Sequence, residues 1–97
     1  MKNYYVYIMA SKRNGTLYIG ITSNLLQRVN QHKSKSVEGF TNKYNVNMLV
    51  YYEYTTNPEA AIQREKTIKK WNRKWKMKLI EKENSEWKDL FDNLLEH

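Results

Sequence analysis

The pair Asn14-Gly15 stands between two runs rich in β-branched and aromatic residues, and it is a strong turn signal. Both residues tolerate the positive φ angle that a tight hairpin demands. Residues 4–9 and 16–21 on either side are therefore predicted to form two antiparallel strands. This hairpin constrains the fold of the whole chain, because every later element must pack against it.

The register of the hairpin decides how close two tyrosines come. A two-residue loop would pair Arg13 with Thr16 and Tyr7 with Thr22. Tyr7 and Tyr18 would then share a face but stand about four positions, roughly 13 Å, apart. If both belong to one site, the loop must be wider than the Asn-Gly pair suggests. A shift of the strand register by two or four residues keeps Tyr7 and Tyr18 on the same face of the sheet.

The rest of the pattern predicts one more strand and several helices. Residues 48–54 begin with an almost continuous apolar run, so we expect a strand in or beside the middle of the sheet. Asn24 can cap a helix over residues 25–35 and Asn57-Pro58 can start another that reaches Trp71. Residues 34–40 are predicted to be a loop. The inward stripe of the first helix is expected to be Leu25, Leu26, Val29 and His32.

Towards the C-terminus, Asn72 can cap a short helix and Ser85 another, an amphipathic helix over about residues 86–95. The three tryptophans, Trp71, Trp75 and Trp87, are assigned to the core, with base stacking as the alternative for one that is exposed beside lysines. The prediction is a single α+β domain over residues 1–97, sandwich-like, with a core of about residues 2–82. Its three-stranded antiparallel sheet is flanked by helices.

The composition narrows the class of protein. The chain has 97 residues and no cysteine, which excludes a disulfide framework and thiolate metal sites. No stretch approaches the about 20 apolar residues of a membrane span, so we expect a soluble cytoplasmic protein without membrane contact. With only two histidines, no HExxH motif and no glycine-rich phosphate loop, zinc and nucleotide sites are disfavoured.

The positive charge is concentrated in one segment. Residues 61–82 carry nine Lys and Arg against two Glu, which equals the net charge of +7 of the whole chain. Such concentration favours a polyanion, and nucleic acid is the commonest one. A solvated helix face is the plainer alternative.

A few side chains have the chemistry of phosphodiester cleavage. Arg28 and His32 are four residues apart and share one helix face, where they could bind a phosphate and carry a proton. Glu65 falls within the apolar stripe of its helix, so it is expected to meet a metal, an arginine or a donor. An ordinary pair with Lys69 is an equal alternative for Glu65.

Each of the other candidates also has an ordinary explanation. Tyr7 and Tyr18 are most often packing aromatics in a sheet. Gly20, near a strand end, marks a close backbone approach or a bend.

Together these positions resemble the GIY-YIG nuclease superfamily, and within it the small stand-alone bacterial proteins with one excision-repair-like endonuclease domain, the UPF0213 type. The match runs through Tyr5-Val6-Tyr7, Tyr18-Ile19-Gly20, Arg28 and His32, residues 40–44, Glu65 and residues 68–71. It covers residues 2 to about 90. One departure is that Tyr5 replaces the glycine of the first motif.

The resemblance implies a metal-dependent endonuclease that hydrolyses DNA, with RNA as the alternative substrate, and a place in DNA repair. Tyr18 would be the general base, with His32 sharing that role, and Tyr7 would position water or phosphate. Arg28 would stabilise the transition state, and Glu65 would hold one Mg²⁺ or Mn²⁺ ion. The expected nucleic-acid contacts are Gly20, Lys43, Arg64, Lys69, Lys70, Arg73 and Lys74.

Two other functions remain open. A domain with the nuclease fold could bind nucleic acid with little turnover, and a separate targeting protein could supply the choice of substrate. The amphipathic C-terminal helix could instead serve a protein partner.

Overall fold

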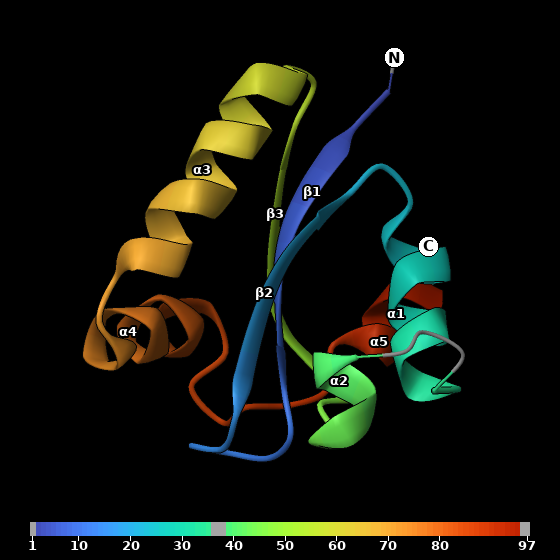
Figure 1. Cartoon of the computed structure of the whole chain (residues 1–97), viewed down its shortest axis with the longest axis vertical. Helices are drawn as coiled ribbons and strands as arrows, with labels where there is room; N and C mark the ends of the chain where they lie inside the picture. The colour runs from blue at the N-terminus through green and yellow to red at the C-terminus, as the bar shows by residue number, and fades with distance from the viewer. Residues whose placement is uncertain (1, 36–38, 96–97) are drawn as a thin grey trace.

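The computed structural model describes residues 2–35 and 39–95. Within them the chain forms the α+β fold expected from the sequence, a three-stranded antiparallel sheet with flanking helices. The elements, in chain order, are β1 (Tyr4–Ala10), β2 (Leu17–Thr22), α1 (Leu25–Lys33), α2 (Phe40–Lys43), β3 (Met48–Thr55), α3 (Pro58–Lys70), α4 (Arg73–Glu83) and α5 (Phe91–Leu95) (Figure 1). The strand order is β2-β1-β3, so β1 is central and β3 lies beside it at one edge.

The hairpin loop between β1 and β2 is wider than two residues. Ser11 and Thr16 close it, since the Ser11 amide donates to the Thr16 carbonyl at 3.0 Å and the Thr16 amide donates to Ser11 Oγ at 3.0 Å. Asn14 has the positive φ, 59°, that the turn signal predicts. The pairing of Tyr7 with Thr22 is wrong, because the four-residue loop shifts the register by two and Tyr7 pairs with Gly20.

Each face of the sheet is covered by its own layer of helices. In Figure 1, α3 and α4 lie on one side of the sheet, and α1, α2 and α5 lie on the other. Alternate strand residues supply the two cores. The α3–α4 side buries Val6, Ile8, Ala10, Ile19, Val50, Tyr51, Ala61, Ile68, Ile80 and Trp87. The α1 side buries Tyr7, Met9, Leu25, Val29, Val46 and Leu49.

Three asparagines begin three helices, as the sequence predicts. The Asn24 side chain accepts from the Gln27 amide, Asn57 accepts from two amides of α3, and Asn72 accepts from the Trp75 amide. These side-chain oxygens satisfy amides that have no partner within the helix. The caps fix where α1, α3 and α4 begin and therefore which of their residues face the sheet.

Several details of the helices differ from the prediction. Helix α1 ends at Lys33, and Leu26 is 43% exposed, so it is not part of the inward stripe. The predicted loop over residues 34–40 ends earlier than expected because Phe40 starts α2, while residues 36–38 lie outside the described part of the chain. Trp75 is 54% exposed and does not belong to the core.

The segment after α4 runs along the outer edge of β3, and no helix starts at Ser85. Trp87 adopts a positive φ of 56°, which interrupts a helix, and helical structure resumes only at Phe91. Strand β3 has a bulge here, because Met9 pairs with Leu49 and Ile8 with Tyr51, which leaves Val50 without a partner on β1. The buried Asn84 donates to the free Val50 carbonyl at 3.1 Å.

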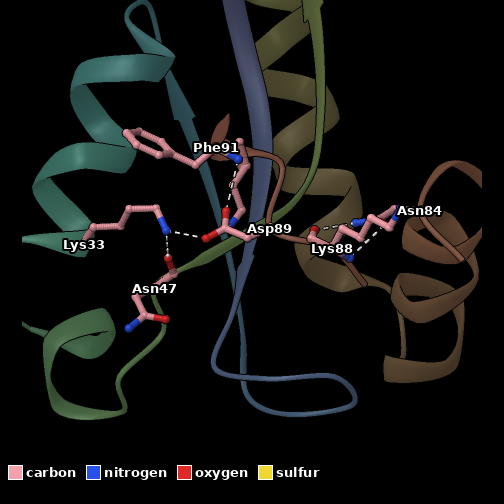
Figure 2. A network of polar contacts seen from close by, with 7 residues as sticks. Lys33, Asn47, Asn84, Lys88, Asp89 and Phe91 are labelled. Carbon is pink, nitrogen blue, oxygen red and sulfur yellow. Dashed lines mark hydrogen bonds and ion pairs between the residues drawn. The ribbon is translucent and has the colours of Figure 1, made fainter. Parts of the chain in front are cut away.

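Asp89 ties this segment to the α1 side (Figure 2). One carboxylate oxygen accepts from the backbone amides of Leu49 and Phe91 at 3.2 and 3.1 Å. The other contacts Lys33 Nζ at the end of α1, and that amine also donates to the Asn47 carbonyl at 3.0 Å. The C-terminal segment therefore joins both layers of the fold to β3.

Across residues 2–35 and 39–95, none of the helices has the length and apolar character needed to cross a membrane.

Candidate active site

Tyr7 lies at the centre of the candidate site, on the middle strand and with 0% of its surface exposed. Its ring lies directly over Gly20 on the neighbouring strand. A Cβ atom added at Gly20 would come within 2.5 Å of the Tyr7 Cζ and hydroxyl oxygen. The close approach predicted for Gly20 is thus to the Tyr7 ring, and glycine is required there because any side chain would occupy the same space.

The Tyr7 hydroxyl begins a buried chain of polar groups. It lies 3.0 Å from His32 Nε2, and His32 Nδ1 lies 2.9 Å from Thr41 Oγ1 on α2. His32 and Thr41 are only 3% and 4% exposed. Burial and the nearby Arg28 charge lower the pKa of His32, so the imidazole is neutral at pH 7. A neutral imidazole donates from one nitrogen and accepts at the other, which allows a proton to be passed along the chain.

Arg28 joins this cluster from α1. The Tyr7 and Tyr18 phenols lie close enough to its guanidinium to raise the pKa of that group above its ordinary value, with Tyr7 as the main cause. Arg28 Nη1 also donates to Gln31 Oε1 at 3.3 Å. Burial raises the pKa of Tyr7 to about 12 although Arg28 acts in the opposite direction. Tyr7 is therefore a neutral phenol at pH 7.

Tyr18 occupies the outer side of the cluster. It pairs two positions from Tyr7 in the register, opposite Met9, and its ring lies 6.3 Å from the Tyr7 ring and 5.4 Å from the His32 ring, centroid to centroid. On its other side, Phe40 stacks on it at 6.2 Å with an interplanar angle of 30°. Tyr18 is only partly buried, in contrast to Tyr7.

Glu65 comes from α3, which covers the face of the sheet opposite to α1, so it is not part of the Tyr7 cluster. Its side chain is 14% exposed, which agrees with its predicted place in the inward stripe, and it also forms the alternative pair with Lys69 at 2.9 Å. The Glu65 charge contributes to the raised pKa of Tyr7, as the smallest of several causes after burial. The carboxylate therefore acts on Tyr7 only through its charge, and the two side chains form no hydrogen bond in the described part of the chain.

The basic residues predicted to contact nucleic acid have different surroundings. Arg64 Nε donates to both Glu53 oxygens at 3.2 and 3.1 Å, and Arg73 donates to the carbonyls of the hairpin turn at Asn14 and Gly15. Lys43 lies 5.4 Å from the centre of the Tyr44 ring on the α1 side. Lys70 and Lys74 are exposed and have no ion-pair partner in the part of the chain that the structure describes.

Two residues of the cluster were not singled out as site residues in the sequence. Thr41 and Phe40 both come from α2, a one-turn helix that the sequence pattern does not show. They do lie in the run of residues 40–44 that carries part of the resemblance. That run was the one available signal for them.

The donors present suit a hard divalent cation. No group of three or more His, Cys, Asp or Glu side chains suited to a metal was found in residues 2–35 and 39–95. Mg²⁺ is commonly held by one or two carboxylates together with waters and substrate phosphate, whereas zinc needs three or four protein ligands. The partly buried carboxylate of Glu65 fits the first kind of site.

The chain is similar to proteins of a known family. Residues 3–79 match the GIY-YIG catalytic domain. A UPF0213 protein of Staphylococcus haemolyticus is 36% identical over 81 residues, which cover 84% of this chain and 98% of that protein. One from Clostridium perfringens is 38% identical over 76 residues, 78% of this chain and 81% of that protein.

A solved structure shows the same fold. The solution NMR structure of a UPF0213 protein from Bacillus halodurans superposes with a TM-score of 0.57 at 25% identity, covering 90% of this chain and 92% of that one. The fold is therefore of the nuclease type, and this chain belongs to the GIY-YIG family, among its UPF0213 proteins.

Proposed function

We propose that the protein is a divalent-metal-dependent endonuclease that hydrolyses phosphodiester bonds in DNA. The observation that supports this best is the meeting of Tyr7, Tyr18, Arg28 and His32. One guanidinium lies beside two phenols, and the Tyr7 phenol lies 3.0 Å from a neutral imidazole. Phosphodiester hydrolysis requires activation of a water molecule and stabilisation of negative charge on phosphate. The cluster contains groups for both tasks.

The two tyrosines are suited to different tasks. Tyr18 is partly exposed, so it can meet an attacking water, and it is the better candidate for general base. Tyr7 is fully buried and has a raised pKa, so it acts as a neutral donor that positions the phosphate or the water.

In the proposed reaction, Tyr18 acts as a phenolate, and the water oxygen forms a bond to phosphorus as the water proton passes to that phenolate. The bond from phosphorus to the leaving oxygen breaks, and this oxygen departs as an alkoxide that takes a proton from solvent water. Arg28 stabilises the negative charge that builds on the phosphate oxygens during this step. The Thr41–His32 pair holds the Tyr7 hydroxyl in place.

Glu65 would hold one Mg²⁺ or Mn²⁺ ion. Such an ion, when bound, adds positive charge that assists departure of the leaving oxygen. Binding would require Glu65 to exchange its contact with Lys69 for one with the ion. Helix α3 contacts the edge strand β2, so Glu65 and the Tyr7 cluster would have to meet the same phosphate around that edge of the sheet.

Cleavage of supercoiled plasmid tests the proposal. Wild-type protein with Mg²⁺ or Mn²⁺ should nick the plasmid, and Glu65→Gln should abolish nicking without lowering the melting temperature. Glu59→Gln is the matched control, because it removes an exposed carboxylate from the same helix and should keep full activity. Equal nicking by Glu65→Gln and wild type would overturn the mechanism.

One contact favours a second function, a nucleic-acid-binding domain without turnover. Glu65 is already neutralised by Lys69, so this site could be retained for its shape alone. Such a domain would bind DNA or RNA with strong salt dependence, and the slope of log affinity against log salt would fall by about one for each phosphate-contacting lysine removed. It would show no metal-dependent nicking with any substrate.

A further inference from the structure

An aromatic surface lies where α3 meets α4, on the side of the sheet away from the Tyr7 cluster (Figure 1). We call it the tryptophan patch. It is a shallow pocket of about 350 Å³ lined by Trp71, Trp75, Lys78, Leu79 and Lys82. Ligand pockets start at about 300 Å³, so the patch can take one planar ring system rather than a large ligand.

Trp75 is exposed although other apolar residues of α4 are not. Ile80 is buried, and Met77 and Leu79 pack against the core of the α3–α4 side, but Trp75 belongs to neither core cluster and is 54% exposed. Its ring meets the Trp71 ring edge-on at 6.0 Å and 80°. The Trp71 ring therefore supports the Trp75 ring at one edge, while much of the Trp75 surface stays exposed to water.

The charges around the patch have one sign. Lys78 and Lys82 border the rings, and neither has an ion-pair or hydrogen-bond partner in the part of the chain that the structure describes. Glu81, the nearest acid in sequence, accepts from Trp87 Nε1 at 2.8 Å. Arg64 lies 5.3 Å from the centre of the Trp71 ring, which leaves Trp75 as the more accessible of the two rings.

We infer that the tryptophan patch binds a single strand of nucleic acid, with an unpaired base stacked on Trp75 and its flanking phosphates on Lys78 and Lys82. Exposed aromatic rings beside lysines bind single strands in this way, because every base has a π face and every linkage a charge. In a duplex the bases are stacked on one another and cannot reach Trp75. The patch thus favours substrates with unpaired nucleotides.

The inference rests on the proposed nucleic-acid function but not on catalysis. The patch and the Tyr7 cluster lie on opposite sides of the sheet, so the patch would hold a strand that flanks the cleaved one. Binding at the patch can therefore be measured in a variant that does not cut.

The experiment uses the full chain carrying Glu65→Gln and fluorescence anisotropy with three labelled probes: a 12-nucleotide oligothymidine, the same length of abasic backbone, and a 12-base-pair duplex. Trp75→Ala should weaken binding of the oligothymidine about 5- to 150-fold, the range of a lost base stack. Binding of the abasic strand and the duplex should change less than twofold.

Two further variants separate stacking from charge and from folding. Tyr54→Ala removes another exposed aromatic ring, on β3, and should leave all three affinities unchanged. Lys78→Ala should lower the salt slope of oligothymidine binding by about one. Trp75→Phe keeps a flat ring and should restore most of the affinity.

Three results would overturn the inference. The first is unchanged oligothymidine binding by Trp75→Ala. The second is an equal loss for all three probes, which would make the patch a site of charge alone. The third is a wild-type dimer in gel filtration that becomes monomeric in Trp75→Ala, since the patch would then be occupied by a second copy. Nicking activity in the Glu65→Gln chain would contradict the proposed function and leave these binding results independent of it.

Discussion

The Tyr7 hydroxyl lies 3.0 Å from Nε2 of His32, and both residues are almost fully buried although they are 25 positions apart in the chain. The contact joins the central strand to α1. It also makes the protonation state of His32 matter to the fold, because an imidazolium at this position would be charged, largely out of water and beside the Arg28 guanidinium.

The first prediction concerns acid stability. Burial lowers the pKa of His32 in the folded protein, so below the unfolded value of about 6.5 the unfolded state binds more protons and the fold loses stability. The contribution of His32 is complete above about pH 6.5 and falls by at most about 1.4 kcal/mol per pH unit below it.

Urea unfolding at pH 7.5 and 5.5 measures this effect. With His97→Gln as the background, His32 is the one remaining histidine of the two in the chain. Replacing His32 as well, by Gln, should reduce the difference in unfolding free energy between the two pH values. If the difference stays unchanged, His32 is not the cause of the lower stability at pH 5.5.

The second prediction concerns Thr41. Thr41→Val keeps the shape of the side chain but leaves His32 Nδ1 without its partner, which should cost about 1–3 kcal/mol of unfolding free energy. Thr41→Ser retains the hydroxyl and should stay near wild type. If Thr41 positions His32 for catalysis, the valine variant should also shift the pH profile of nicking, and the serine variant should restore it. If Thr41→Val lowers the nicking rate without shifting its pH profile, Thr41 has a structural role only.

The third prediction concerns Gly20. Gly20→Ala must displace the Tyr7 ring, because its Cβ would lie 2.5 Å from ring atoms of a side chain packed in the core. Overpacking of this kind costs about 1–3 kcal/mol, and nicking should be lost together with the position of Tyr7. Tyr7→Leu removes the clashing atoms, so the alanine should cost much less in that background. A double-mutant cycle by urea unfolding measures the coupling, and additive effects would contradict the contact.

The fourth prediction concerns Asp89. Asp89→Ala removes an acceptor for the Leu49 and Phe91 amides and the partner of Lys33, so it should destabilise the fold by about 2–4 kcal/mol. Asp89→Asn keeps one side-chain oxygen that can accept from the backbone amides, so it should lose less unfolding free energy. Glu86→Ala breaks an ion pair in which both side chains are more than 70% exposed, and should change stability little. A loss of similar size in the alanine variants of Asp89 and Glu86 would refute the role of the network.

The sequence predicted most elements of this fold because their signals are local. Asparagine caps and the Asn57-Pro58 pair fix helix starts whatever surrounds them, and alternation of apolar residues marks the strands. The sequence left the hairpin register open between a two-residue loop and a shift of two or four residues, because Asn14-Gly15 reveals a turn but not its length. The structure has the shift of two. The Ser11 side chain widens the loop, and a side chain that closes a turn from outside is not visible in the dipeptide.

The candidate site was predictable only in part, for a similar reason. Arg28 and His32 share a helix face by spacing alone, but their contact with Tyr7 depends on the register and on the missing side chain at Gly20. Thr41 depends on a four-residue helix too short for periodicity to show. The C-terminal segment was misread because Trp87, at an apolar helical spacing, takes a positive φ and is buried against α4 instead.

The bulge at Val50 has a consequence for how the protein behaves at high concentration. The outer edge of β3 would offer unpaired backbone groups to any second sheet, which is a common route to aggregation. Here the Leu49 amide donates to the Asp89 carboxylate, and the Leu49 carbonyl accepts from the Leu90 amide. The Asn84 side chain donates to the Val50 carbonyl. No extra strand is needed to cover this part of the edge, because three contacts from an irregular segment occupy the backbone groups of Leu49 and Val50 that a neighbouring molecule could bind.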